Sequence, residues 1–246
     1  MQVDLVCAIH QPNLFPRLST LAKLLAADVW IVLDDVQFNS RDYQHRARLA
    51  APGQPAPSQW LSLPVYRPRG RNTAINEVVL LEPTKSSRRL TGLLQQHYGR
   101  SRFWPEVRAV AYELAKIVGN GGRLAEITEE STRALLQLLN WRGMVIRSSE
   151  LAVRGERSAR LADLALAVGA DRYLCGPGGA KYLSTQPFNE YGIEVGYPAP
   201  PSRTAWQANR GVSTLHWVAE IGFAELRQGL LGAEQPVGWR SMTATR

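Results

Sequence analysis

The sequence has few cysteines, few lysines and no long apolar run. Only two cysteines occur in 246 residues. Cys7 and Cys175 both stand in apolar, strand-like runs, which predicts two buried free thiols rather than a disulfide. No uncharged apolar stretch reaches the roughly 18 residues that a membrane span needs. The amino terminus carries Asp4 and has no basic lead-in, so it does not resemble a signal peptide. We therefore expect a cytoplasmic protein without a membrane partner.

The positive charge is concentrated in two segments. The formal net charge is +8, and only four of the 29 basic side chains are lysines. Residues 36–72 contain six arginines against one aspartate, and residues 84–102 contain four arginines, one lysine and no acid. Clustered arginine favours anionic ligands, either nucleotide phosphates or a nucleic-acid backbone. An arginine-rich solvated surface would give the same pattern, and the sequence alone leaves both interpretations open.

The order of the expected elements predicts an α/β fold, with a Rossmann-like parallel sheet and a central helical insertion. Apolar runs alternate with helical periodicity at both ends of the chain. The insertion covers about residues 85–140, one domain covers residues 1–230, and residues 231–246 form a loosely ordered tail. We expect strands at 3–9, 29–33, 60–65, 75–81, 144–147, 171–175 and 193–196, helices at 18–27, 85–98, 105–118, 123–139, 158–168 and 213–220, and an irregular loop at 39–58.

Two polar turns follow the first two strands. Residues 10–16 read His-Gln-Pro-Asn-Leu-Phe-Pro, and Asp34 and Asp35 end the second strand. An imidazole at a strand end can hydrogen-bond a phosphate or carry a proton near neutral pH. A carboxylate there could hold a ribose hydroxyl, bind an amine, act as a base or help to bind Mg²⁺. Ligands of parallel sheets bind beyond the carboxyl ends of the strands, so we expect these turns to form a site.

A third turn is rich in glycine. Residues 176–181 read Gly-Pro-Gly-Gly-Ala-Lys and follow the expected strand at 171–175. Backbone amides of such a turn can approach an anion, with help from the dipole of a following short helix. The spacing is neither that of a P-loop nor that of a dinucleotide-binding fingerprint. We expect all three turns to line one cavity, with walls that include Phe15, Phe38 and Tyr182.

Several of these segments together resemble the WbqC-like protein family. The resemblance covers residues 5–222 and includes the turn at 10–16, Leu-Asp-Asp-Val-Gln-Phe at 33–38, Trp-Leu-Ser-Leu-Pro-Val at 60–65 and the glycine turn. It implies transfer of an aminoacyl group, notably glycyl, to an amine of a nucleotide sugar or a similar acceptor. The chain departs from the family pattern at 17–19, at His45 and Ala47, and at His216, which stands where an aspartate is frequent. These departures concern the choice of acceptor.

Two functions therefore stand as expectations. The first is an amide-forming acyltransferase whose donor is an aminoacyl-tRNA or an acyl adenylate; the adenylate would need ATP and Mg²⁺ as cofactors. The second is a non-catalytic nucleotide- or RNA-binding module that assists a partner biosynthetic enzyme. No metal ligands are assigned. The expected catalytic residues are His10, Asp34 and Asp35, and the expected substrate-binding residues are Gln11, Asn13, Phe15, Gln37, Arg46, Gly176, Gly178, Gly179, Lys181 and Tyr182.

Overall fold

The fold is built on a five-stranded parallel sheet, as the sequence predicts. The computed structural model describes residues 4–153, 157–176, 178–198, 206 and 210–231. The strand order is β7-β2-β1-β8-β9, and every neighbouring pair is parallel. This is the Rossmann-like arrangement expected from the alternation of strands and helices. The strands are β1 (Val6–His10), β2 (Val29–Val32), β7 (Met144–Arg147), β8 (Arg172–Leu174) and β9 (Glu194–Gly196).

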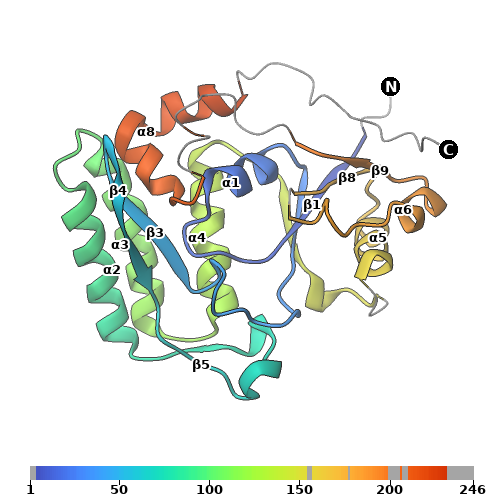
Figure 1. The fold of residues 1–246 in the computed structure, drawn as a ribbon, viewed down its shortest axis with the longest axis horizontal. Helices are drawn as coiled ribbons and strands as arrows, with labels where there is room; N and C mark the ends of the chain where they lie inside the picture. Colours follow the sequence, from blue (N-terminus) through green and yellow to red (C-terminus); the bar gives the residue numbers. More distant parts are fainter. Residues whose placement is uncertain (1–3, 154–156, 177, 199–205, 207–209, 232–246) are drawn as a thin grey trace.

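Each face of the sheet packs against its own set of helices. Ala8 and Trp30 belong to one hydrophobic core, whereas their neighbours Cys7 and Ile31 belong to the other, because successive strand side chains point to opposite faces. α1 (Leu18–Leu25) and α4 (Leu124–Leu138) contribute to the first core, and α5 (Arg157–Ala167) and α6 (Gln186–Glu190) contribute to the second. Figure 1 shows these two helical groups on either side of the strands. Both cysteines are buried and free, as predicted.

Three helices lie between β2 and β7 in the chain. They are α2 (Pro83–Tyr98), α3 (Trp104–Asn120) and α4, close to the helices predicted from periodicity. α8 (Thr214–Leu231) packs against α3 and extends beyond the predicted 213–220 (Figure 1). It is kinked at Gly222, whose φ is +77°. A side chain at this position would place its Cβ 2.6 Å from the Phe103 ring, so the helices approach closely at the kink.

The prediction of an irregular loop at residues 39–58 is confirmed for residues 39–45 and wrong from residue 46 onward. β3 (Arg46–Ala51) and β4 (Gln54–Ser62) form an antiparallel hairpin whose register shifts between Ala50 and Ala51. Ala47 and Leu49 are fully buried and alternate with more exposed arginines, which is the pattern of a half-buried strand. A two-stranded hairpin can accommodate proline, because each of its strands has one open edge.

The remaining elements are short. The expected strand at 75–81 is a 3-10 turn, η2 (Ile75–Glu77), followed by β6 (Val79–Leu80), which pairs with β5 (Val65–Tyr66). The Glu77 carboxylate accepts the Ala74 N–H at 2.8 Å and so closes the turn instead of extending a strand. Two further 3-10 turns are η1 (Gly70–Asn72) and η3 (Ser148–Glu150). The predicted tail at 231–246 lies, apart from its first residue, outside the described residues.

Candidate functional site

A cavity lies at the point where the chain reverses its direction across the sheet. From β1 the chain moves outward through β2 to β7, and it then returns to the other side of β1 to form β8 and β9. The crevice between the carboxyl ends of β1 and β8 is therefore the topological switch point, where open α/β sheets bind ligands. A cavity of about 510 Å³ is found there. It is lined by the turn after β1, the first half of α1 and the glycine turn after β8.

His10 is the last residue of β1, and both of its ring nitrogens have partners. Nδ1 lies 3.2 Å from Lys23 Nζ, and Nε2 lies 3.1 Å from the Asn13 side-chain nitrogen. Lys23 Nζ also donates to the Ile9 carbonyl at 2.9 Å. Burial, with the charges of Lys23 and Arg17, holds the pKa of His10 well below its usual value of 6.5. His10 is therefore neutral at physiological pH. His10, Asn13, Arg17 and Lys23 all line the cavity.

Lys23 is the most unusual residue of the cavity. It lies on α1, three residues after Thr20, and only 4% of its surface is exposed. Burial lowers the pKa of its ammonium group from 10.5 to about 8, because a charge loses solvation inside the protein. A Cβ added at Gly176 would lie 3.6 Å from Lys23 Nζ, so the lysine reaches from α1 to the end of β8. It thereby joins two of the predicted turns.

The turn at residues 10–16 is held by the helical insertion. Ser131 on α4 accepts the Phe15 N–H at 2.7 Å, and Thr132 donates to the Asn13 carbonyl at 3.1 Å. Phe15 has a φ of +41°, which is strained for a residue with a side chain. It is fully buried in the core and does not line the cavity, contrary to expectation. Phe38 is likewise a core residue, so the two predicted aromatic walls are structural.

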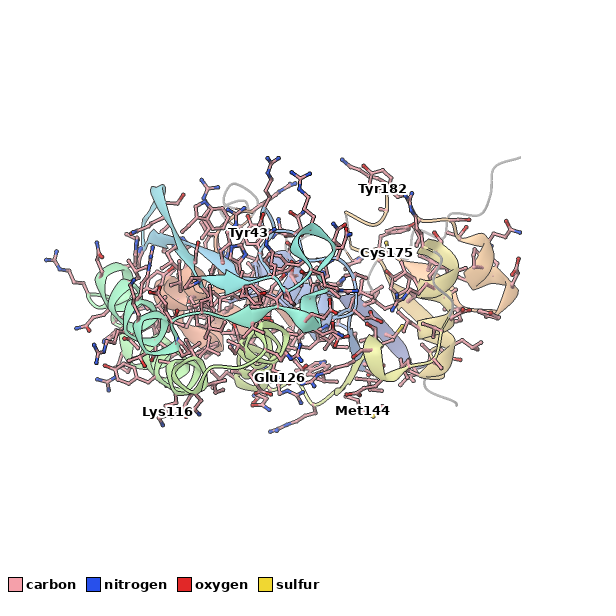
Figure 2. All side chains as sticks on the ribbon, turned by 90° about the horizontal axis from the view of Figure 1, so that it is seen from below. Tyr43, Lys116, Glu126, Met144, Cys175 and Tyr182 are labelled. Atoms are coloured by element: carbon pink, nitrogen blue, oxygen red, sulfur yellow. The ribbon has the colours of Figure 1, made fainter. Side chains whose placement is uncertain are left out.

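The glycine turn lines the cavity with Gly176, Gly178 and Gly179, as predicted. The Gly179 N–H, however, donates to the Gly176 carbonyl at 3.0 Å and is used within the turn. A Cβ at Gly179 would lie 2.9 Å from Cys175 Sγ, so only glycine fits this close approach. Tyr182 is 81% exposed and Lys181 is also exposed; Figure 2 shows Tyr182 at the outer surface, beyond Cys175. Within the described residues, neither of them lines the cavity.

Asp34 and Asp35 do not face His10, which corrects the expectation of one shared cavity. Asp34 accepts hydrogen bonds from the Ser149 hydroxyl at 2.7 Å and the Ser149 N–H at 3.1 Å. Asp35 accepts from the Ser148 hydroxyl at 2.6 Å and forms an ion pair with Arg160. The two carboxylates therefore tie the end of β2 to the end of β7. Asp34 lines a separate cavity of about 420 Å³.

Three other predicted binding residues have partners within the protein. Gln37 donates to the Arg71 carbonyl at 2.6 Å. Arg46 donates to the Asp42 carbonyl at 3.1 Å, and its guanidinium lies 4.1 Å from the centre of the Trp60 ring. Among the described residues, neither Gln37 nor Arg46 lines the cavity beside His10. Gln11 does line it and accepts the Gln44 side-chain amide at 2.9 Å.

Sequence reasoning missed the charged lining of the cavity. Among the described residues, Arg17, Lys23 and Arg210 contribute three cations to the lining, against the single carboxylate of Asp42. The Arg17 guanidinium lies 4.4 Å from the centre of the Tyr43 ring. One signal was present in the sequence: Lys23 is the only charged residue in an otherwise apolar and hydroxyl-bearing helix, and lysine is rare in this chain. The contribution of Arg210, from the far end of the sequence, had no local signal.

The fold and cavity define a doubly wound α/β protein with a polar, cation-lined cavity at its switch point. The chain belongs to the WbqC-like protein family, whose model matches residues 11–215. It is also 24% identical over 190 residues to a protein of Mycobacterium tuberculosis (strain ATCC 25618 / H37Rv) described as "Uncharacterized protein Rv1507c". That match covers 76% of this chain and 79% of the relative. No solved structure matches the chain.

The described residues contain neither a metal-binding group nor a membrane-spanning helix. Across the described ranges, no three His, Cys, Asp or Glu side chains are grouped as ligands of a metal ion would be. None of the described helices is both long and apolar enough to cross a membrane. In the part of the chain that the structure describes, the polar groups of the cavity include a histidine, a lysine, amides, hydroxyls, two arginines and one carboxylate. This set suits binding of an anion and transfer of a proton.

Proposed function

We propose that the protein is an amide-forming acyltransferase. It moves an aminoacyl group, glycyl or similar, from an activated donor to an amine of a nucleotide sugar or natural-product intermediate. The observation that carries the proposal is the position of His10: a neutral imidazole in a cavity at the switch point of the sheet. The family resemblance of the turn at 10–16 supports the same reaction.

The cationic lining supports a donor that carries phosphate. Arg17 is the N-cap residue of α1, whose first turn has neither a side-chain cap nor an acidic residue. A helix N-terminus of this kind attracts an anion, and the guanidinium groups of Arg17 and Arg210 add formal charge. Both an aminoacyl-tRNA and an acyl adenylate carry a phosphate close to the reactive carbonyl. An adenylate donor would bring ATP and Mg²⁺ into the reaction.

The chemistry requires a proton acceptor and hydrogen-bond donors. The neutral amine attacks the carbonyl carbon of the donor, and a new carbon–nitrogen bond forms. The nitrogen then loses a proton, and the bond between the carbonyl carbon and the donor oxygen breaks. The leaving group is the ribose hydroxyl oxygen of an aminoacyl-tRNA or the phosphate of an adenylate. His10 accepts the proton. Asn13, which lines the cavity and is only 4% exposed, donates its amide N–H to the oxygen that becomes negative.

The test is formation of the amide. The purified protein is incubated with glycyl-tRNA or a glycyl adenylate analogue and a panel of amine acceptors, and the product is detected by mass spectrometry. Turnover that disappears in His10→Ala supports the proposal. Products that form equally fast without the protein, or with the His10 variant, contradict it.

The second candidate is a non-catalytic nucleotide- or RNA-binding module. It is favoured by the exposed basic loop that contains Arg67 and Arg71. Arg69 in the same loop is paired with Glu77, which reduces the charge available there. A protein that binds tRNA or nucleotide but forms no amide with any donor would favour this second function.

A further inference from the structure

His10 alone is a weak acceptor for a proton from an amine. Its pKa lies well below 6.5, because burial and the neighbouring cations oppose a charge on the ring. A base works best when its pKa is near the working pH and near that of the proton donor. The amine nitrogen of an acyl acceptor holds its proton more strongly than such an imidazole. Another group must therefore take the charge.

The group in contact with His10 is Lys23, and its protonation state fixes where the imidazole carries its proton. As an ammonium, Lys23 donates to both the Ile9 carbonyl and His10 Nδ1. A neutral His10 then has its hydrogen on Nε2 and has no lone pair for a substrate. The Asn13 oxygen, which has no partner as placed, becomes the acceptor for this hydrogen once the amide is turned over.

The hydrogen bonds of His10 differ when Lys23 is a neutral amine; this is the second of the two protonation states of the pair, the first being the one with Lys23 as an ammonium. The nitrogen lone pair of neutral Lys23 accepts a hydrogen bond from Nδ1–H of His10 across the same 3.2 Å contact. The lone pair of Nε2 then accepts an N–H of the Asn13 amide at 3.1 Å, and a substrate N–H that takes the place of this amide reaches the lone pair from the cavity that both side chains line. Only this second state offers the substrate a proton acceptor.

We propose that Lys23 is the final acceptor of the substrate proton and that His10 relays the proton to it. This rests on the proposed acyl transfer. The amine nitrogen gives its proton to Nε2 of His10, and the Nδ1 proton passes to Lys23, so the ring is neutral before and after the step. The departing ribose oxygen of an ester donor takes a proton back by the reverse path, and the protons balance. Lys23 acts through His10 and exchanges no proton with the substrate directly.

The surroundings of Lys23 suit this role. The charged and titratable groups that face it are the thiols of Cys7 on β1 and Cys175 after β8, Tyr173 on β8, Arg17 at the N-cap of α1 and His10 itself. Burial raises the pKa of the Cys7 thiol to about 12 and raises the pKa of Cys175 and Tyr173, so these groups stay neutral. Asp42 and Arg210 line the same cavity. Lys23, with a pKa of about 8, is thus the group that changes charge near the working pH.

The test is the tautomer of His10, read from the ¹⁵N chemical shifts of its ring in the full-length protein. We expect hydrogen on Nε2 below the pKa of Lys23 and on Nδ1 above it, with one midpoint for the change. Lys23→Met removes the change, whereas Lys116→Met, at an exposed position on α3, preserves it. A tautomer that stays the same on both sides of this pKa in the wild-type protein overturns the proposal, and this result needs no variant that folds.

Activity gives a second measurement. If the acyl transfer is found, Lys23→Met should lower turnover by roughly 10²-fold and remove the alkaline rise of the pH profile, while Lys116→Met changes neither. Equal pH profiles for wild type and Lys23→Met would overturn the relay. If the tautomer changes with Lys23 but no donor yields an amide, the proposed function fails and the proton coupling between the two residues stands.

Discussion

Replacing Lys23 with methionine should change how the stability of the protein depends on pH. In the folded protein the pKa of Lys23 is about 8, and its ordinary value is 10.5. Below both values the lysine is charged in both states. Between them the unfolded chain keeps the proton that the folded protein has lost. Because the unfolded state then binds more protons, stability must rise with pH across this window.

The size of the effect follows from the two pKa values. Each pH unit between them contributes about 1.4 kcal/mol, so the interval from about 8 to 10.5 corresponds to about 3–4 kcal/mol of unfolding free energy. Lys23 is only 4% exposed, and solvent screening therefore reduces this figure little. Methionine has a similar length and cannot titrate. The stability of wild type relative to Lys23→Met should therefore increase by about this amount as the pH is raised.

Urea denaturation at a series of pH values measures this difference. Other groups that titrate in the same range affect both proteins and largely cancel when the two free energies are subtracted. Lys116→Met is the matched control, because the Lys116 side chain is 69% exposed and its charge stays in water in both states. If the difference in unfolding free energy between wild type and Lys23→Met stays constant over the whole window, burial does not lower the pKa of Lys23.

Three further predictions concern the site and its support. His10→Ala should lower turnover by roughly 10²-fold or more while Tm changes little, and a variant that unfolds or keeps full activity would contradict the chemical role. Ser131→Ala should destabilise the protein by about 1–3 kcal/mol in urea melts, because it leaves the buried Phe15 N–H unpaired. The control is Ser87→Ala, which removes a hydroxyl that donates to the Ala115 carbonyl on α3 over the same distance of 2.7 Å. This variant should lose less unfolding free energy than Ser131→Ala, and equal losses would contradict the prediction. Neutralising Arg67, Arg69 and Arg71 together should make polyanion binding less dependent on salt. The slope of log K against log salt should fall by about 0.9 for each duplex phosphate contact that is lost, and by somewhat less on single strands. The ion pair of Arg69 with Glu77 limits the contribution of Arg69, and an unchanged slope would show that none of the three arginines binds the polyanion.

The parallel sheet was predictable because its strands are apolar runs with clear ends. β7 has the predicted bounds at 144–147, where Gly143 precedes a run of apolar residues and Ser148 follows it. The hairpin of β3 and β4 was missed because prolines and a glycine dominate its sequence. In β3, buried alanine and leucine alternate with arginine, and without knowledge of burial this composition is typical of a basic loop.

The candidate site was predictable only in part. β1 and β8 are neighbours, so the His10 turn and the glycine turn meet as expected. β1 and β2 are neighbours too, yet Asp34 and Asp35 turn towards the serines that follow β7. Strand order does not reveal which hydroxyls will bind a carboxylate. Lys23 was missed because a lysine on a surface helix usually extends its amine into water.

The hydrogen bonds from α4 to the turn at 10–16 have a consequence for synthesis of the protein. The Thr132 hydroxyl binds a carbonyl 119 positions earlier in the chain, and the Ser131 hydroxyl binds an amide 116 positions earlier. The ribosome therefore makes His10 long before it makes the residues that fasten its turn. A nascent chain that ends before α4 has the imidazole and Lys23 but lacks these attachments. Translation through the insertion is thus a precondition for a properly shaped cavity, and truncated products should be inert.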